Sequence, residues 1–184
     1  MRIITGKARG TRLETLEGEA TRPTTERVKE ALFSVIQFDI EGRRILDLFA
    51  GSGQLGIEAL SRGATGCVFV DQNKESTEVI RRNLKAAGLT ANTQVLSTDA
   101  LSYLVRPQDH FDIVFLDPPY FAGLMESVLE KVEPLVNQGG MVICETDRKA
   151  DLPSSVGRLS LARTYQYGKT QVWLYRVVQA DSEV

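Results

Sequence analysis

The sequence predicts an α/β fold, a doubly wound and mostly parallel sheet of seven strands that ends in an antiparallel hairpin. Three observations lead to this prediction. Short apolar runs alternate with amphipathic segments from residue 44 onward, a glycine-rich turn follows the first run, and two β-rich runs near the end are separated only by Gly168 and Lys169. Strand–helix alternation at this spacing is typical of βαβ units, whose strands run parallel.

The expected parallel strands are short runs rich in Val, Ile, Leu and Phe, without strict alternation of polar and apolar positions. Such runs suit strands that are covered on both faces. The predicted strands are 44–49, 67–70, 94–97, 111–116 and 141–144, and the predicted helices between them lie near 54–62, 74–87, 99–105 and 122–135.

Both ends of the chain add elements to this core. Residues 159–167 and 170–178 predict the terminal antiparallel hairpin. Residues 27–36 predict an amphipathic helix, which Thr24 or Thr25 would cap.

We expect a single domain over residues 1–184. In this prediction, residues 1–43 form a basic arm and a helix, a candidate lid over RNA and cofactor. Residues 44–184 form the catalytic core. The length fits one domain better than two.

Composition excludes several classes of protein. The formal net charge of −2 provides no global basic field, so any nucleic-acid binding must come from a local patch. Cys67 and Cys144 lie in apolar runs without CxxC spacing, which favours two reduced core thiols. His110 is the only histidine, so a multi-histidine metal site is excluded. We therefore expect a cytoplasmic, monomeric protein without a metal and without a membrane segment.

The glycine-rich turn at residues 47–56 has the pattern G-x-G-x-x-G, and Asp71 follows twenty residues after Gly51. This pattern is the dinucleotide fingerprint, with the acid placed to accept a ribose hydroxyl. However, Asp47 precedes the turn inside the strand, where it would repel a pyrophosphate and needs a partner if buried. A cationic adenosine ligand without phosphate, S-adenosylmethionine, fits Asp47 better than NAD does.

Acidic residues recur where the predicted strands end. They are Asp71, Asp99, Asp117 and Glu145. Ligands of open α/β sheets bind outside the carboxyl ends of the strands, so these acids are expected at one edge. Asp99 suits either a contact to an adenine amino group or the N-cap of the next helix. Glu145 has no assigned role.

The run 111–120 ends in Asp117-Pro118-Pro119-Tyr120. The two prolines remove two N–H donors, so the exit of the strand offers acceptors, the Asp117 carboxylate and the Pro118 carbonyl, beside Tyr120. An exocyclic base amine is a poor nucleophile because its lone pair is delocalised into the ring. Two acceptors on its hydrogens would favour the nucleophilic form, and Tyr120 would stack on a base removed from its helix. The alternative is a rigid turn with a buried tyrosine.

These motifs resemble those of known methyltransferases. The pattern D-x-F-x-G-x-G is similar to the first motif of class I S-adenosylmethionine-dependent enzymes, and D-P-P-Y to the motif of those that methylate base amines. The resemblance implies Asp117, Pro118 and Tyr120 as catalytic residues. It implies cofactor binding by Asp47, Phe49, Ala50, Gly51, Gly53, Asp71, Gln72, Asp99, Ala100 and Thr25, with Asp47 and the two glycines at the methionine end and Asp71 at the ribose.

The resemblance extends to the order of motifs in the RsmD family of bacterial 16S rRNA (guanine-N2)-methyltransferases. It covers residues 2–10, 22–33 and 47–63, the D-P-P-Y motif, and Tyr167-Gly168-Lys169-Thr170. It implies that the substrate is one guanine of 16S rRNA, presented by the small ribosomal subunit, and that the products are N2-methylguanine and S-adenosylhomocysteine. Guanine N2 rests on this resemblance alone, because the motif suits adenine N6 and cytosine N4 equally.

Basic residues at the start of the chain support an RNA substrate. The first twelve residues contain four basic residues and no acid, and such an arm can contact phosphates. The alternative is a solvated charged edge. The candidate RNA contacts are Arg2, Lys7, Arg9, Arg12, Arg22 and Arg27.

Two other functions fit parts of the sequence. A nicotinamide-dependent oxidoreductase would explain G-x-G-x-x-G and Asp71, but not Asp47 or D-P-P-Y. A non-catalytic ribosome-assembly module on a methyltransferase fold is the other alternative.

Overall fold

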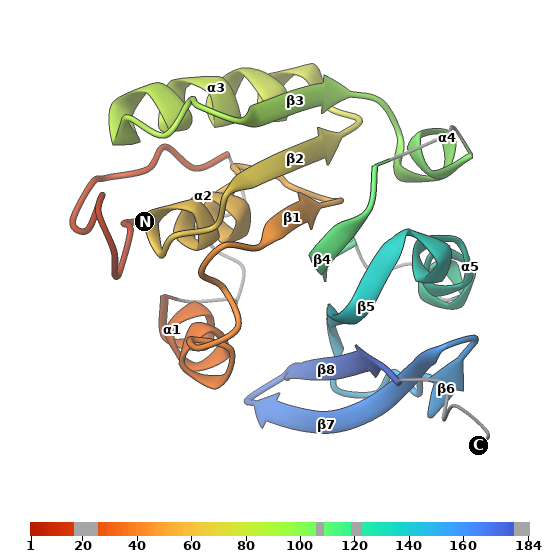
Figure 1. Cartoon of the computed structure of the whole chain (residues 1–184). Helices are drawn as coiled ribbons and strands as arrows, with labels where there is room; N and C mark the ends of the chain where they lie inside the picture. Colours follow the sequence, from red (N-terminus) through yellow and green to blue (C-terminus); the bar gives the residue numbers. More distant parts are fainter. Residues whose placement is uncertain (17–25, 106–108, 119–122, 179–184) are drawn as a thin grey trace.

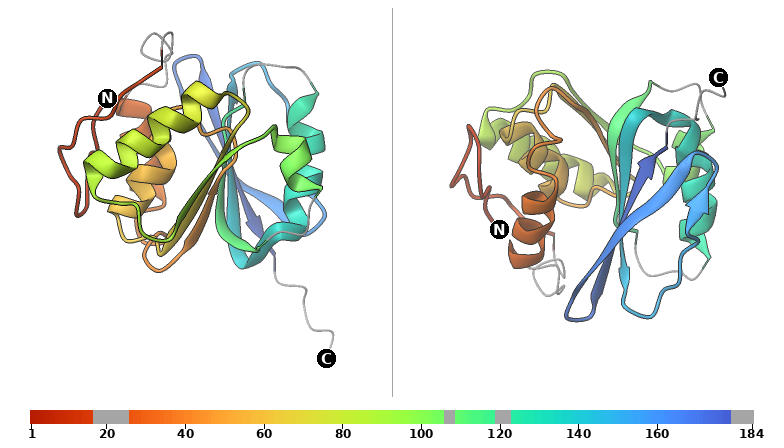
Figure 2. Two further views of the ribbon diagram at one scale, coloured as in Figure 1. Left: turned by 90° about the horizontal axis from the view of Figure 1, so that it is seen from above. Right: turned by 60° about the horizontal axis from the view of Figure 1, so that its bottom comes forward.

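The computed structural model describes residues 1–16, 26–105, 109–118 and 123–178. One sheet carries the eight strands of this part of the chain, in the order β3-β2-β1-β4-β5-β8-β7-β6. Helices cover both faces of the sheet, which gives three layers (Figures 1 and 2). The predicted doubly wound fold is confirmed.

The first five strands run parallel, and the last three pair antiparallel, as predicted. The eighth strand, β6, has only two residues, too few for a pattern in the sequence to reveal it. The strands are β1 (Arg44–Asp47), β2 (Gly66–Asp71), β3 (Thr93–Ser97), β4 (Phe111–Leu116), β5 (Val136–Asp147), β6 (Ser155–Val156), β7 (Leu159–Tyr167) and β8 (Thr170–Val177).

Helices α1, α2 and α3 cover one face of the sheet, and α4 and α5 cover the other (Figure 2). Each face has its own cluster of buried apolar side chains, as expected for strands that are covered on both sides. The helices are α1 (Glu26–Val35), α2 (Gln54–Ser61), α3 (Lys74–Ala87), α4 (Ala100–Leu104) and α5 (Leu124–Val132), and a 3-10 turn, η2 (Glu133–Leu135), follows α5.

One boundary differs clearly from the prediction. Strand β5 begins at Val136 rather than at 141, because Val136 pairs with Phe111 ahead of an irregularity in the β4–β5 register. The polar residues 137–140 hide this start in the sequence. The preceding helix ends early at Val132, and the turn that follows contains Pro134, which lacks the N–H donor of an α-helix interior.

Gly56 allows α2 to lie directly on β2. A Cβ atom built on Gly56 would come within 2.4 Å of Cε1 of Phe69 and within 2.7 Å of Sγ of Cys67. This is the role expected of the third glycine in G-x-G-x-x-G, which permits close packing of helix on strand.

Replacing Gly56 with alanine therefore separates two physical effects. Helix propensity alone would stabilise the protein by about 0.8–1.0 kcal/mol. Overpacking against Phe69 and Cys67 should reverse the sign and destabilise it by about 1–3 kcal/mol. Urea denaturation measures the free energy of unfolding, and a stabilised G56A protein would contradict the packing seen here.

Both cysteines are buried free thiols, as predicted. Burial raises the pKa of the Cys67 and Cys144 thiols, which keeps them protonated and unreactive. Among the described helices, none has the length and apolar character needed to cross a membrane. The described residues also contain no group of three or more metal-ligating side chains.

The described part of the N-terminal arm packs on α2. Residues 1–13 fold back on themselves, with an isolated bridge between Arg2 and Arg12, and bury Ile3, Ala8 and Leu13 in the core. The backbone N–H groups of Ile4 and Thr5 donate to the Glu58 carboxylate at 2.9 and 3.0 Å. The arm is therefore an integral part of the fold.

A buried cluster of charges holds the arm in place. Lys29 and Glu58 are both fully buried, with Nζ and Oε2 3.5 Å apart, and Arg62 Nε donates to Glu58 Oε1 at 2.8 Å. Lys29 Nζ also donates to the Arg2 carbonyl at 2.9 Å. Burial lowers the Lys29 pKa, and the opposing attraction of Glu58 only partly offsets this effect.

Candidate active site

The glycine loop, residues 48–53, lies at the carboxyl edge of the sheet between the ends of β2 and β4. Leu48 donates its N–H to Phe115 of β4 at 3.2 Å, and Ala50 donates to Val70 of β2 at 3.1 Å. Gly51 and Gly53 have φ angles of 54° and 79°, a left-handed conformation that favours glycine. The chain order reverses at β1 and β4, where open α/β sheets bind their ligands.

Asp71, at the end of β2, ties this loop to the next one. Its Oδ2 accepts from Gly51 N at 2.9 Å, and its Oδ1 accepts from Asn73 N at 2.8 Å. An ionised carboxylate has about four lone-pair sites, so Asp71 keeps capacity for the hydroxyls of a ribose.

Asp47 has a partner inside the protein. It is 2% exposed, and its Oδ2 accepts from the N–H of Gly56 at 2.9 Å. Buried Asp47 therefore does not depend on a cationic ligand, in contrast to the prediction from the sequence, because a backbone donor of α2 already stabilises its carboxylate. Its negative charge still makes this end of the loop favourable for a cation.

Asp99 caps α4, one of the two roles that its position allowed. Its Oδ1 accepts from Ser102 N at 2.9 Å. Hydrogen bonds from the Ser102 side chain and backbone lower the pKa of Asp99, so it is ionised at neutral pH. The contact to adenine stays a prediction. Among its predicted neighbours, Ala100 is buried as the first residue of α4 and Gln72 is exposed after β2.

Asp117 and Pro118 follow β4 directly, with Asp117 half-buried and Pro118 buried. Leu116 of β4 pairs with Cys144 of β5. Asp117 and Glu145, the next residue in each segment, are therefore neighbours at the carboxyl edge of the sheet. Glu145 is 7% exposed, and both carboxylates interact with other residues of the chain. Phe49 is half-buried and Ala50 buried in the glycine loop. The predicted residues Tyr120, Thr25 and Arg22, with the cap candidate Thr24, lie outside the described residues.

A buried asparagine supports the glycine loop from behind. Asn83 of α3 is 1% exposed, and its Nδ2 donates to the Ser52 carbonyl and to the Glu14 carbonyl, both at 3.0 Å. Its Oδ1 accepts from Glu14 N at 2.8 Å. This link between the arm and the glycine loop was not predicted from the sequence. The available signal is an amide on the apolar face of α3, between Ile80 and Leu84.

The candidate RNA contacts of the arm are exposed. Arg2, Lys7, Arg9 and Arg12 all lie at the surface, and so does Arg27 in the first turn of α1. Arg2 approaches Glu26 at 3.9 Å, with more than half of its side chain in solvent. These positions are compatible with phosphate contacts and with a solvated charged edge.

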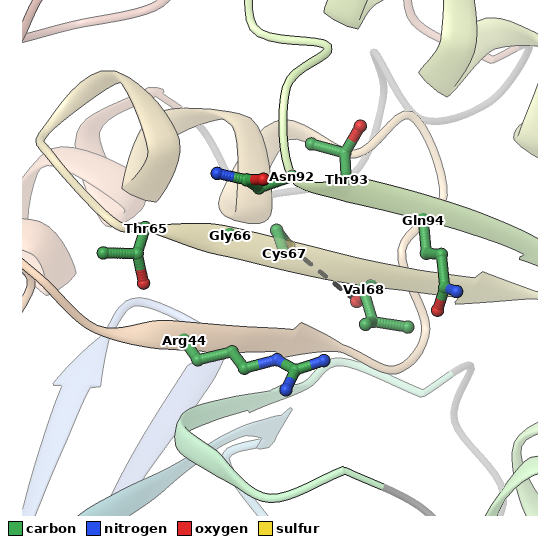
Figure 3. Close-up of a pocket in the computed structure, with 8 residues that line it drawn as sticks. All are labelled: Arg44, Thr65, Gly66, Cys67, Val68, Asn92, Thr93 and Gln94. Atoms are coloured by element: carbon green, nitrogen blue, oxygen red, sulfur yellow. Dashed lines mark hydrogen bonds between the residues drawn. The ribbon is translucent and has the colours of Figure 1, made fainter.

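A pocket of about 450 Å³ lies at the opposite edge of the sheet (Figure 3). It is lined by the first residues of β1, β2 and β3 and by residues just ahead of them, so it is separate from the glycine loop. Arg44 in this pocket pairs with Asp109 and lies over the Phe111 ring at 5.5 Å, so its charge is already compensated. The lining residues are Arg44, Thr65, Gly66, Cys67, Val68, Asn92, Thr93 and Gln94.

The chemistry of the carboxyl edge fits S-adenosylmethionine. Carboxylates follow or end β2, β4 and β5 and precede α4, and Asp47 adds a buried negative charge below the loop. Such a set suits a ribose diol, a sulfonium and an ammonium group, and disfavours a pyrophosphate. The left-handed glycines let the backbone approach the ligand closely.

Comparison with known proteins identifies the family of this chain. The family described as Conserved hypothetical protein 95 matches residues 1–176. The Bacillus subtilis protein YlbH is 40% identical over 96% of this chain and 98% of that protein. The ribosomal RNA small subunit methyltransferase D of Escherichia coli K12 is 34% identical over 100% of this chain and 93% of that protein.

Solved structures show the same fold. Protein yhhF of Escherichia coli superposes with a TM-score of 0.87 at 34% identity, over 96% of this chain and 97% of that chain. The T. thermophilus 16S rRNA N2 G1207 methyltransferase RsmC, solved with AdoMet and guanosine, has a TM-score of 0.72 at 21% identity, over 89% of this chain and 45% of that chain. The extent of the family match and the identity to full-length relatives show that the chain belongs to the RsmD family, the family of the ribosomal RNA small subunit methyltransferase D proteins.

Proposed function

We propose that this protein methylates the exocyclic N2 amine of a guanine in small-subunit ribosomal RNA, with S-adenosylmethionine as methyl donor. One observation carries the proposal. The glycine loop, tied down by Asp71, and the Asp117-Pro118 exit of β4 flank the point where the strand order reverses. The names of the RsmD-family relatives support an RNA of the small subunit.

We infer which residues would hold the donor from their positions at the carboxyl edge of the sheet. The backbone of Ala50, Gly51 and Gly53 forms the cradle, and Asp71 is placed for the ribose hydroxyls. Asp99 and Ala100, where α4 begins, would contact the adenine. When bound, S-adenosylmethionine supplies an electrophilic methyl group on its sulfonium.

The chain's own contribution to the reaction is to prepare the amine. The Asp117 carboxylate and the Pro118 carbonyl accept the two N–H bonds of the guanine amine and keep its lone pair directed at the methyl carbon. An N–C bond forms as the S–C bond breaks, and one amine proton leaves to Asp117 or to water. Stabilisation by acceptors already in place needs no reorganisation during the reaction.

The test uses small subunits from a strain that lacks the enzyme, incubated with S-adenosylmethionine that carries a labelled methyl group. Mass spectrometry of the nucleosides should find the label in N2-methylguanosine. Label in N6-methyladenosine or N4-methylcytidine would overturn the guanine assignment, and no incorporation would overturn the proposal as a whole.

Asp71→Ala should weaken S-adenosylhomocysteine binding. The variant loses a charged acceptor for the ribose and releases Gly51. A hydrogen bond to a charged group contributes about 1.5–3 kcal/mol, so the dissociation constant should rise about tenfold to more than a hundredfold. Calorimetry measures this constant. Asp109→Ala, at the amino edge of the sheet, is the control, and equal affinities of the two variants would exclude Asp71 from the site.

A further inference from the structure

The C-terminal hairpin extends beyond the strand that carries Asp117. Glu145 lies beside Asp117 on the neighbouring segment. Glu145 pairs with Val172 of β8, and Val172 pairs with Tyr165 of β7. From this row, β7 and β8 continue for two more residues to Tyr167 and Thr170, about 7 Å at the usual rise per residue. The turn of the hairpin therefore lies at the carboxyl edge of the sheet, beyond the end of β4.

The β7–β8 hairpin is close enough to Asp117 to contact the same RNA. Strand β7 lies three strand spacings from β4, which amounts to about 14 Å. A strand of RNA that places one base beside Asp117 can therefore reach β7 with nucleotides that flank that base.

One face of β7 combines a cation with aromatic rings. Arg163, Tyr165 and Tyr167 occupy alternate positions of the strand, so their side chains share the face that α1 covers in part. Arg163 is exposed and both tyrosines are half-buried against the core. Burial raises the pKa of Tyr167, so its phenol is neutral at physiological pH. Neither hydroxyl is hydrogen-bonded to a described residue.

Further cations surround the tip of the hairpin. Arg148 and Lys149 follow β5, Lys169 lies in the hairpin turn, and all three are exposed. Arg148 N donates to the Lys169 carbonyl at 2.9 Å, which joins the two segments at the backbone. Within the described ranges, no carboxylate pairs with these three side chains or with Arg163, whereas Arg158 and Arg176 of the same region are paired.

We propose that this surface, formed by Arg148, Lys149, Arg163, Tyr165, Tyr167 and Lys169, binds the RNA strand that flanks the methylated nucleotide. The inference rests on the proposed function and adds a second RNA contact to that site. Unpaired cations contact phosphates, and tyrosine rings next to them stack on bases. On a chain with net charge −2, these four cations have no carboxylate partner among the described residues and form a local basic patch of the kind that RNA binding requires.

The test compares two double variants with the same change of charge. Lys149→Ala/Lys169→Ala removes two cations of this surface. Lys85→Ala/Lys131→Ala removes two exposed lysines from the last turns of α3 and α5, which lie at the opposite edge. Small-subunit methylation is measured at several salt concentrations, and calorimetry gives the affinity for S-adenosylhomocysteine.

The hairpin variant should show a KM for the small subunit that is raised at least about fivefold, with kcat and S-adenosylhomocysteine affinity unchanged. The slope of log KM against log salt should fall by about 1.4, or 0.7 for each lost contact to a single strand. The control should match the wild type in KM and in slope.

Two results would overturn the inference. One is a KM equal to that of the control. The other is a raised KM with an unchanged salt slope, because a contact to ribosomal protein without phosphates would release no counterions. A wild-type protein that methylates no small subunits would instead reject the proposed function, whereas wild-type activity with an unaffected hairpin variant would reject only the hairpin surface.

Discussion

Asp117→Ala should lower the rate of methyl transfer about tenfold to more than a hundredfold, because a hydrogen bond to a charged acceptor contributes roughly 1.5–3 kcal/mol. The effect should fall on kcat, since Asp117 acts on the amine as it becomes a nucleophile. The glycine loop and Asp71 are untouched by the substitution. The affinity for S-adenosylhomocysteine should therefore stay near that of the wild type.

Single-turnover methylation of small subunits and calorimetry with S-adenosylhomocysteine separate the two quantities. Asp117→Asn keeps the shape and one acceptor oxygen, so it should retain more activity than Asp117→Ala. A loss of cofactor affinity that parallels the loss of turnover would assign Asp117 to cofactor binding or to the fold instead.

Glu58→Ala should cost about 3–5 kcal/mol of folding free energy, the range for breaking a buried ion pair by removing one partner. Lys29 would keep its full burial without the opposite charge, which would lower its pKa further. The N–H groups of Ile4 and Thr5 would lose their acceptors at the same time. The arm and α1 should both loosen.

Urea denaturation tests this expectation against a matched surface pair. Arg82 Nη2 and Glu14 Oε2 are 2.9 Å apart, but both side chains are more than half exposed, so Glu14→Ala should cost far less folding free energy than Glu58→Ala. Lys29→Met combined with Glu58→Gln removes both charges and should recover part of the stability lost in Glu58→Ala. Equal losses of folding free energy in Glu58→Ala and Glu14→Ala would show that the buried cluster stabilises the fold no more than an exposed ion pair does.

Local patterns in the sequence were sufficient for the elements of the core. Apolar runs without alternation predicted all five parallel strands because both faces of those strands are covered. The spacing of Gly51, Gly53 and Gly56 predicted the turn between β1 and α2, where positive φ angles and close packing tolerate little else. Asp71 was expected at the end of β2, and its bond to Gly51 places it beside the loop.

The partners of buried polar groups could not be predicted in the same way. Asp47 was expected to need a ligand, and the structure gives it the N–H of Gly56. Glu58 received no role, although it holds the arm across more than fifty residues of sequence. Asn83 reaches Glu14 and Ser52 over separations of 69 and 31 residues.

The difference has a physical cause. Strands, helices and turns depend on the backbone and on side chains a few positions apart, so the order of residues alone was enough to establish the α/β core, the glycine turn and the acids at the strand ends. The satisfaction of a buried charge depends on which distant segments meet around it. Only tertiary packing made Glu58 the anchor of the N-terminal arm and brought the C-terminal hairpin to the edge that carries Asp117.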